Sequence, residues 1–465
     1  MAEKNFGFFI RRVLILGVPL ILQQMLFSSL GIIDNIMVSQ LGTSEVAAAG
    51  VGLRIFIYSM VIIWGFGLGV GILVAQFWGA KDRDGVKRYL AVGQLIALML
   101  TSVIFVIAYF FPQAFTTLYN VTGDTKYVAE TYIQYVSFAI LLSAPVITLE
   151  AGIRSIGQTK LTLFLSLAEV ALNILLNYML IFGKLGAPEM GVAGSAIGTS
   201  LARAFRFIAT LAIIYIWYPT LAFGPRHLKQ ALGVKVLRKY LSVTLPTMAG
   251  TVIWTVGLFV LNVIVGRMGE QQLAVSTVIS SLESFALAAA GGTSGAVAIL
   301  IGNALGAGHF SLSQAYARYA GWMALFTGLL VAAVIIASSP IIMPFYEQLT
   351  PEAQALTLAC LPVLAFSMIF RVINVVLIVG VLRAGGDNTY CMYLDFFCQW
   401  VWAIPATLVA ALWFQWALPW VFFMIASEEM VKLIPTLQRV RSGKWLNNLT
   451  KDETKAADQT QAVEA

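Results

Sequence analysis

Residues 73–82 read LVAQFWGAKD, and residues 300–309 read LIGNALGAGH. The two stretches lie 227 residues apart, and each places a Gly-Ala pair after an apolar run. Three further pairs match in the same order: Val18-Pro19 with Leu245-Pro246 and Leu41-Gly42 with Met268-Gly269 at the same offset, and Arg154–Gly157 with Arg383–Gly386 at an offset of 229. Four matches in one order indicate that the chain contains an internal duplication.

The composition of the chain is that of a membrane protein. Hydrophobic residues make up 59% of it and charged residues 11%, whereas soluble proteins carry about 25% charged residues. A helix that crosses the ~30 Å hydrocarbon layer needs about 20 apolar residues. Twelve runs meet this requirement: 13–38, 47–78, 89–111, 127–152, 161–183, 192–218, 240–266, 273–303, 319–338, 352–381, 390–413 and 418–437. We therefore predict an all-α polytopic membrane protein with twelve transmembrane helices.

The number of helices in each repeat determines how the halves are related. Because each repeat contains six predicted helices, both enter the membrane from the same side, as parallel repeats do. We expect two pseudo-symmetric six-helix lobes with a central cleft, an arrangement that favours alternating access. The predicted parts are an N-lobe at 1–222, a cytoplasmic linker at 223–239, a C-lobe at 240–440 and a disordered cytoplasmic tail at 441–465.

The distribution of basic residues predicts the orientation. Of the 29 Lys and Arg residues, 21 fall in the termini and in the loops that we assign to the cytoplasm. This asymmetry places both termini in the cytoplasm of a bacterium, with the chain in its inner membrane. The basic residues of 226–239 are expected to lie against anionic lipid headgroups, so the net charge of +7 needs no nucleic-acid partner.

Polar residues inside the predicted helices are candidates for a binding site, because an ionisable residue at that depth costs roughly 2.5–3.5 kcal/mol. Asp34 lies near the outer end of the first helix. Glu169, Asn173 and Asn177 follow each other at i, i+4 spacing and share one face of the fifth helix. From a rise of 1.5 Å per residue, Asn177 lies roughly 9 Å below the outer end of its helix, close to the depth of Asp34 and of Thr199 in the sixth helix.

Structural explanations exist for each of these residues. Asp34 could reach water at the helix end or pair with a base, and asparagines commonly join helices by hydrogen bonds. The duplication provides an internal comparison, because Asp34 corresponds to Leu261 and Asn177 corresponds to Ala406. Groups that only hold the repeat together would be needed in both halves. Their presence in the N-terminal half alone favours a specialised site there.

A buried carboxyl group surrounded by amides and a hydroxyl can bind a small cation. Burial disfavours the ionised form of a carboxyl group and allows proton exchange near neutral pH, and the same oxygens could hold Na⁺. Gln23 shares the face of Asp34 and could line a cavity or pack in the core. Glu169 could relay protons or pair with an arginine. We expect inter-helix ion pairs from Arg203, Arg206, Glu283 and Arg371.

Other classes of function lack the residues that they require. No G-x-x-x-x-G-K-[ST] loop occurs, so the chain itself cannot use ATP through a P-loop. His227 and His309 fall in predicted cytoplasmic loops, and no catalytic or metal-ligating constellation is apparent, which argues against an enzyme. Cys360, Cys391 and Cys398 show no metal or redox spacing and are expected to pack within helices. We expect no cofactor apart from a coupling ion.

Five stretches together resemble the multidrug and toxic compound extrusion (MATE) transporters. They are LVAQFWGAKD at 73–82, LAEVALNILLNYMLIFG at 167–183, MGVAGSAIGTSLAR at 190–203, LIGNALGAGH at 300–309 and VLRAGGDNTY at 381–390. The resemblance extends over about residues 10–440. It implies a twelve-helix, two-lobe antiporter that expels cationic and amphipathic drugs or dyes in exchange for H⁺ or Na⁺.

The resemblance also assigns the site. The family's first-helix aspartate matches Asp34, its fifth-helix pair matches Asn173 and Asn177, and its sixth-helix hydroxyl matches Thr199. The second fifth-helix acid of some members is Asn177 here, and the stretches GTVIWTVGLF at 250–259 and RVINVVLIVG at 371–380, which correspond to the C-lobe cation site of other members, contain no carboxylate. These departures favour H⁺ over Na⁺. We expect a monomer that transports small organic cations; the alternative is a flippase of the same superfamily for a lipid-linked precursor.

Overall fold

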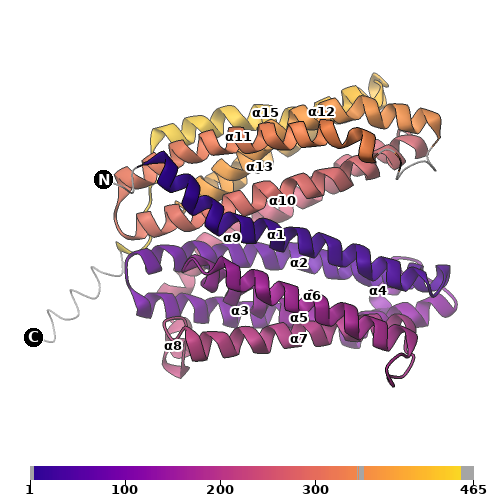
Figure 1. Ribbon diagram of the computed structural model, residues 1–465, viewed down its shortest axis with the longest axis horizontal. Helices are drawn as coiled ribbons and strands as arrows, with labels where there is room; N and C mark the ends of the chain where they lie inside the picture. Colours follow the sequence, from indigo (N-terminus) through magenta and orange to yellow (C-terminus); the bar gives the residue numbers. More distant parts are fainter. Residues whose placement is uncertain (1–4, 343, 345–349, 452–465) are drawn as a thin grey trace, which may run out of the picture. The chain divides into compact units, whose positions relative to one another are not determined.

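The computed structural model describes residues 5–342, 344 and 350–451, and within these ranges the chain is helical, with no strand (Figure 1). The helices of the N-terminal half are α1 Phe6–Ser39, α2 Thr43–Gly79, α3 Arg83–Phe110, α4 Pro112–Leu118, α5 Asp124–Ser155, α6 Thr159–Phe182, α7 Gly191–Trp217 and α8 Pro225–Ala231. Those of the C-terminal half are α9 Val234–Gly266, α10 Glu270–Gly306, α11 Phe310–Ile342, α12 Pro351–Val375, η3 Val376–Arg383, α13 Asn388–Phe396, η4 Phe397–Ala403, α14 Ile404–Leu408, η5 Val409–Trp413 and α15 Leu418–Ser442. The η segments are π-helical continuations.

The predicted membrane spans coincide with these helices. Among the described residues, eleven helices are long and apolar enough to cross a membrane, counting α12 with η3 as one and α13 through η5 as another. The twelfth predicted span, 418–437, falls on α15, whose apolar run is interrupted by Glu428, Glu429 and Lys432. These three side chains are buried, so α15 keeps its charged groups inside the protein. The all-α membrane fold is confirmed.

The duplication is visible in the backbone. Helices α2 and α10 both contain 37 residues and begin 227 residues apart. Each follows a glycine in a positive-φ conformation, Gly42 at 137° and Gly269 at 138°. A side chain would be strained in this conformation, so glycine is required at both positions.

The described chain forms two compact units whose boundaries are offset from the predicted lobes. Unit 2 comprises residues 22–248, and unit 1 comprises residues 1–21 together with 249–465. The predicted lobes were 1–222 and 240–440. Each boundary falls two residues after a proline inside a helix, Pro19 in α1 and Pro246 in α9. Proline removes one hydrogen bond from the helix interior, so each helix changes unit where its hydrogen-bond ladder is interrupted.

Each of these two helices packs closely against a glycine of its unit, and the two glycines occupy equivalent positions in the repeat. In unit 2, a Cβ on Gly65 of α2 would lie 2.6 Å from Cα of Met248 of α9. In unit 1, a Cβ on Gly292 of α10 would lie 2.7 Å from the backbone nitrogen of Ile21 of α1. Both residues of one pair correspond to those of the other at the 227-residue offset. Small residues permit such close helix packing in membranes, and here the duplicated chain uses the same contact twice.

The predicted linker is largely helical. Residues 223–239 contain α8 and the first residues of α9. His227 Nε2 of α8 lies 3.1 Å from Asp84 Oδ1 of α3, and these helices pack together in unit 2.

The prediction of a disordered tail over 441–465 is wrong for its first part. Helix α15 continues to Ser442, and the following residues pack on unit 1. The Trp445 side chain is fully buried, its Nε1 donates to Val440 O at 2.9 Å, and Asn448 Nδ2 donates to Leu305 O at 2.9 Å. A single aromatic residue within a polar stretch thus anchors the tail. Residues 452–465 lie outside the described residues.

This packing predicts a measurable contribution of the tail to stability. Trp445→Ala should lower the free energy of unfolding in detergent by about 3–5 kcal/mol, the range for a large aromatic side chain lost from a core. Gly385→Ala should act in the same direction, because its Cβ would lie 2.1 Å from Trp445 O. Thermal unfolding followed by size-exclusion chromatography measures both, with the exposed Lys444→Ala as control. Equal stability of all four proteins would contradict a structural role for this segment.

Candidate functional site

The four residues of the predicted site come together in unit 2. Asn177 Nδ2 donates to Asp34 Oδ1 at 2.8 Å and approaches Asn173 Oδ1 at 3.2 Å. Asn173 Nδ2 in turn donates to Thr199 Oγ1 at 3.2 Å. One hydrogen-bonded chain therefore joins α1, α6 and α7 through a carboxylate, two amides and a hydroxyl.

The asparagines are deeper than the groups that they connect. Asn173 is 1% exposed and Asn177 0%, whereas Asp34 and Thr199 are partly exposed. Within the described residues, Asp34 takes part in no salt bridge. The carboxylate is thus held by a neutral amide, so its charge is not cancelled by a neighbouring base.

Two glycines of α7 bring this helix against α6. A Cβ on Gly194 would lie 2.5 Å from Leu180 O, and a Cβ on Gly198 would lie 2.3 Å from Asn177 Oδ1. Asn177 Oδ1 is buried without a hydrogen-bond partner, and its Nδ2 faces Asp34. The close packing at Gly198 fixes the Asn177 side chain with its donor group toward the carboxylate.

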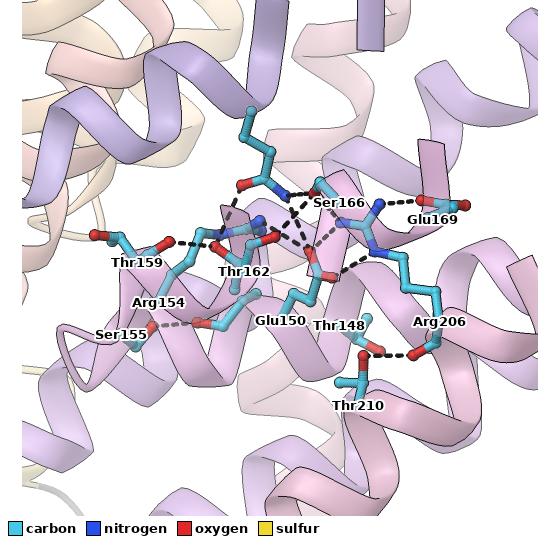
Figure 2. A network of polar contacts seen from close by, with 12 residues as sticks. Thr148, Glu150, Arg154, Ser155, Thr159, Thr162, Ser166, Glu169, Arg206 and Thr210 are labelled. Atoms are coloured by element: carbon cyan, nitrogen blue, oxygen red, sulfur yellow. Dashed lines mark hydrogen bonds and ion pairs between the residues drawn. The ribbon is translucent and has the colours of Figure 1, made fainter. Parts of the chain in front are cut away.

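Below this site, unit 2 contains a buried group of charges that we call the unit-2 charge cluster: Glu150 and Arg154 of α5, Glu169 of α6, and Arg203 and Arg206 of α7. Arg206 lies between the two carboxylates (Figure 2). Its Nε donates to Glu150 Oε1 at 2.6 Å, its Nη2 donates to Glu150 Oε2 at 2.7 Å, and its Nη1 pairs with Glu169 Oε2. Arg203 Nε lies 2.9 Å from Glu169 Oε1.

These contacts describe the surroundings of Glu169. The sequence left open a relay or an arginine pair, and in this structure Glu169 is paired with two arginines. The expected inter-helix pairs of Arg203 and Arg206 are formed. Low dielectric surroundings make such charges costly unless they are paired, which explains why they gather in one place.

Gln23 joins α1 to the same cluster. Its Nε2 donates to Ser166 Oγ at 2.9 Å and to Glu150 Oε2 at 3.3 Å, and Thr162 Oγ1 donates to its Oε1 at 3.3 Å. The sequence left open whether Gln23 lines a cavity or packs in the core. Its side chain is 5% exposed, so it is packed in the core in this structure. Gln23 is also the second α1 residue of unit 2, and it fixes the crossing helix to buried polar groups.

Unit 1 holds a second group of buried and half-buried charges, the unit-1 charge cluster: Glu283, Arg371, Arg383, Asp395, Glu428, Glu429 and Lys432. Arg371 and Glu283, which were both expected in inter-helix ion pairs, pair with each other. Lys432 Nζ lies 2.7 Å from Glu428 Oε1 and 3.2 Å from Asp395 Oδ1, and Asp395 also pairs with Arg383 at 3.0 Å. Asp395 and the charges of α15 were not predicted, although Glu428 and Lys432 lie one turn apart on the same helix; the partners of Asp395 lie on other elements of the chain.

The remaining candidates behave as packing residues. Cys360, Cys391 and Cys398 are free and buried. The guanidinium group of Arg54 on α2 lies 5.7 Å from the centroid of the Tyr119 ring. In the part of the chain that the structure describes, no three His, Cys, Asp or Glu residues are grouped so that they could hold a metal ion.

Helical spans in two equivalent halves, with paired charges inside each unit, define a multi-pass membrane protein of duplicated architecture. Comparison with known families identifies it further. The MatE family matches residues 19–179 and again residues 246–409, one match in each half and 227 residues apart. The chain therefore belongs to the MatE family, that is, to the MATE transporters, and it is a transporter and not an enzyme.

Individual relatives extend over nearly the whole chain. The uncharacterized transporter YisQ of Bacillus subtilis is 26% identical and covers 96% of both chains. The probable multidrug resistance protein NorM of Listeria monocytogenes is 24% identical, over 85% of this chain and 86% of its own. Among solved structures, a MATE transporter of Vibrio cholerae superposes with a TM-score of 0.86 at 17% identity, over 97% of this chain and 99% of its own. This last comparison supports the fold alone.

The unit-1 charge cluster generates a stability prediction. Lys432→Met should lower the free energy of unfolding by about 3–5 kcal/mol, because it leaves Glu428 buried without its base. Glu428→Gln in addition should recover much of this loss, since the uncompensated carboxylate is removed. Thermal unfolding of the single and double variants in detergent measures the effect, with the exposed Arg441→Met of the same helix as control. A double variant no more stable than the single one would show that the pair is not the cause.

Proposed function

We propose that this chain is a secondary antiporter that exports small organic cations in exchange for a cation bound at Asp34. One observation carries the proposal: the Asp34 carboxylate is partly accessible, sits at membrane depth and is held by the Asn177 amide without a salt bridge among the described residues. An ionised group at this depth is costly, and a bound cation lowers that cost. The names of the relatives, multidrug resistance proteins among them, support the same class of substrate.

The arrangement of the amide favours H⁺ over Na⁺ as the coupling ion. Asn177 presents its Nδ2 to both Asp34 and Asn173, while its Oδ1 faces Gly198. A Na⁺ site needs several oxygen ligands around one point. Here a donor group occupies that point, so Na⁺ would require the Asn177 side chain to turn over, whereas a proton on Asp34 requires only the free carboxylate oxygen.

The proposal includes the location of the protein. We infer that it lies in the bacterial inner membrane with both termini in the cytoplasm, on the grounds of the basic residues in the loops on that side. Membrane lipids are then its surroundings, and it acts as a monomer. The substrates are amphipathic cations, because an acidic and otherwise uncharged site disfavours the polyanionic headgroup of a lipid-linked precursor.

Removing the carboxylate tests the proposal directly. Asp34→Asn should reduce gradient-driven efflux of the cationic dye ethidium to the background level, since the variant cannot alternate between an ionised and a neutral state. Everted membrane vesicles with a pH gradient or a Na⁺ gradient imposed separately measure the effect and identify the coupling ion. Glu45→Gln, which changes a carboxylate at the start of α2, is the matched control. Full activity of Asp34→Asn with normal membrane insertion would exclude this mechanism.

The position of Asn177 provides a second test. Gly198→Ala should slow coupled efflux at least about as much as Asn177→Ala, because the new methyl group displaces the Asn177 amide from Asp34. Gly50→Ala on α2 is the control, since no atom lies within 4 Å of its Cβ position. The efflux rate and the amount of folded protein should be measured together. A Gly198→Ala protein with unchanged efflux would show that the Asn177–Asp34 hydrogen bond is dispensable.

A further inference from the structure

The unit-2 charge cluster contains more positive than negative charge. Two carboxylates, Glu150 and Glu169, face three guanidinium groups, those of Arg154, Arg203 and Arg206. The Arg203 and Arg206 side chains and both carboxylates are buried, whereas the Arg154 side chain is 28% exposed. With all five groups ionised, the cluster carries one surplus positive charge inside the membrane-spanning part of the protein.

The hydrogen bonds of the cluster are shared unequally between its two buried bases, Arg203 and Arg206. Arg206 occupies both oxygens of Glu150 and one oxygen of Glu169. Arg203 Nε lies 2.9 Å from the remaining oxygen of Glu169, which is an ion-pair distance, but the N–H group makes no hydrogen bond. The residue is only 6% exposed. Arg154 is paired more weakly still, at 3.6 Å from Glu150 Oε2, but its side chain is 28% exposed. Of the two buried bases, Arg203 is therefore the one with fewer carboxylate contacts.

Helix periodicity places Arg203 beneath the Asp34 site. On α7, Thr199, Arg203 and Arg206 follow at spacings of four and three residues and share one face. On α6, Asn177, Asn173 and Glu169 do the same, and the two faces meet in the contacts of Asn173 with Thr199 and of Glu169 with Arg203. From the helix rise, Glu169 lies about 12 Å below Asn177. The charged cluster and Asp34 are thus the two ends of one polar face.

We propose that the surplus positive charge of the cluster, with Arg203 as its buried base on the face shared with the Asp34 site, sets the cation affinity of that site by repelling a cation there and so promoting its release. The proposal rests on the proposed function of Asp34, and it assigns Arg203 as an affinity-determining residue that does not touch the ion. Two unit charges about 12 Å apart in surroundings of effective dielectric constant about 20 change a binding constant by about tenfold. Such a change is large enough to alter the conditions under which the site empties.

Other ionisable groups around Asp34 do not provide this surplus. From α5, Tyr132 interacts with Asp34 and is neutral. From α2, Glu45 and Arg54 are one acid and one base toward the outer end of the helix. From α6 and α7, the ionisable groups on the shared face are Glu169, Arg203 and Arg206 themselves. The net positive charge acting on Asp34 from within unit 2 is that of the cluster.

A set of variants separates charge from structure. Arg203→Gln makes the cluster neutral, and Glu169→Gln raises its surplus from one to two. Arg203→Lys keeps the surplus at one, and so does the double variant Glu169→Gln with Arg203→Gln, which lacks the whole pair. The measured quantity is the H⁺ or Na⁺ concentration that gives half-maximal ethidium transport in proteoliposomes, whatever the maximal rate of each variant.

The expected order follows the net charge. Arg203→Gln should need about tenfold less cation and Glu169→Gln about tenfold more, while Arg203→Lys and the double variant should stay within about twofold of the wild type. If both Arg203→Gln and the double variant shift in the same direction by the same factor, the effect is structural and the proposal is wrong. No shift in any variant also overturns it.

The two proposals fail in different ways. If Asp34→Asn still transports ethidium with the cation dependence of the wild type, the proposed function of Asp34 is wrong regardless of Arg203. If Asp34→Asn is inactive but the half-maximal cation concentration of the cluster variants does not change with the net charge of the cluster, Asp34 remains the site and the role of Arg203 is excluded. Size-exclusion profiles of every variant in detergent confirm that the folded proteins are being compared.

Discussion

The hydrogen bond from Asn177 Nδ2 to Asp34 Oδ1 is the interaction on which the proposed chemistry depends. It holds a carboxylate without neutralising it, within a helix that is long and apolar enough to cross a membrane. A salt bridge in its place would bind the charge permanently, and a lipid-facing position would force the group to stay protonated. A neutral donor allows both states of the carboxyl group. The close approach of α7 at Gly198 keeps that donor in position.

The same constraint organises the charges elsewhere. Hydrocarbon cannot solvate an ion, so every deeply placed base of the two clusters lies near an acid from another turn or another helix. The two halves pair their buried charges with different residues, although equivalent positions of their backbones have the same geometry. Gly65 and Gly292, and Gly42 and Gly269, are equivalent positions with equivalent geometry. Asp34 and Leu261 are equivalent positions with different chemistry, which indicates that the packing was retained in both halves while the polar group was not.

Much of this arrangement could be predicted from the sequence, and the failures have physical causes. The convergence of Asp34, Asn173, Asn177 and Thr199 followed from helix periodicity and depth, because each residue lies on a long helix whose ends were clear. Glu150 and Asp395 were missed, since pairing across helices depends on the rotation of each helix, which an apolar run does not determine. A signal for Glu150 existed, however: Arg154 follows it by one helical turn.

The tail and the unit boundaries were missed for another reason. The segment after Lys444 is polar on average, and composition alone does not distinguish one buried anchor such as Trp445 from a solvated residue. Pro19 and Pro246 were recognised only as markers of the repeat. That each helix changes unit just after its proline is a property of three-dimensional contacts, which the offset between the halves does not encode.

Counting the charges of Asp34 and of the unit-2 charge cluster explains why exchange would be favoured over simple binding. With Asp34 ionised, three acids and three bases balance: Asp34, Glu150 and Glu169 against Arg154, Arg203 and Arg206. One bound cation then leaves a net charge of one, and a second would leave a net charge of two in surroundings of low dielectric constant. A coupling ion and an organic cation therefore compete for the same neutralising charge even if they touch different atoms. Under the proposed function, this competition is the physical basis of antiport, because either cation can enter only after the other has left.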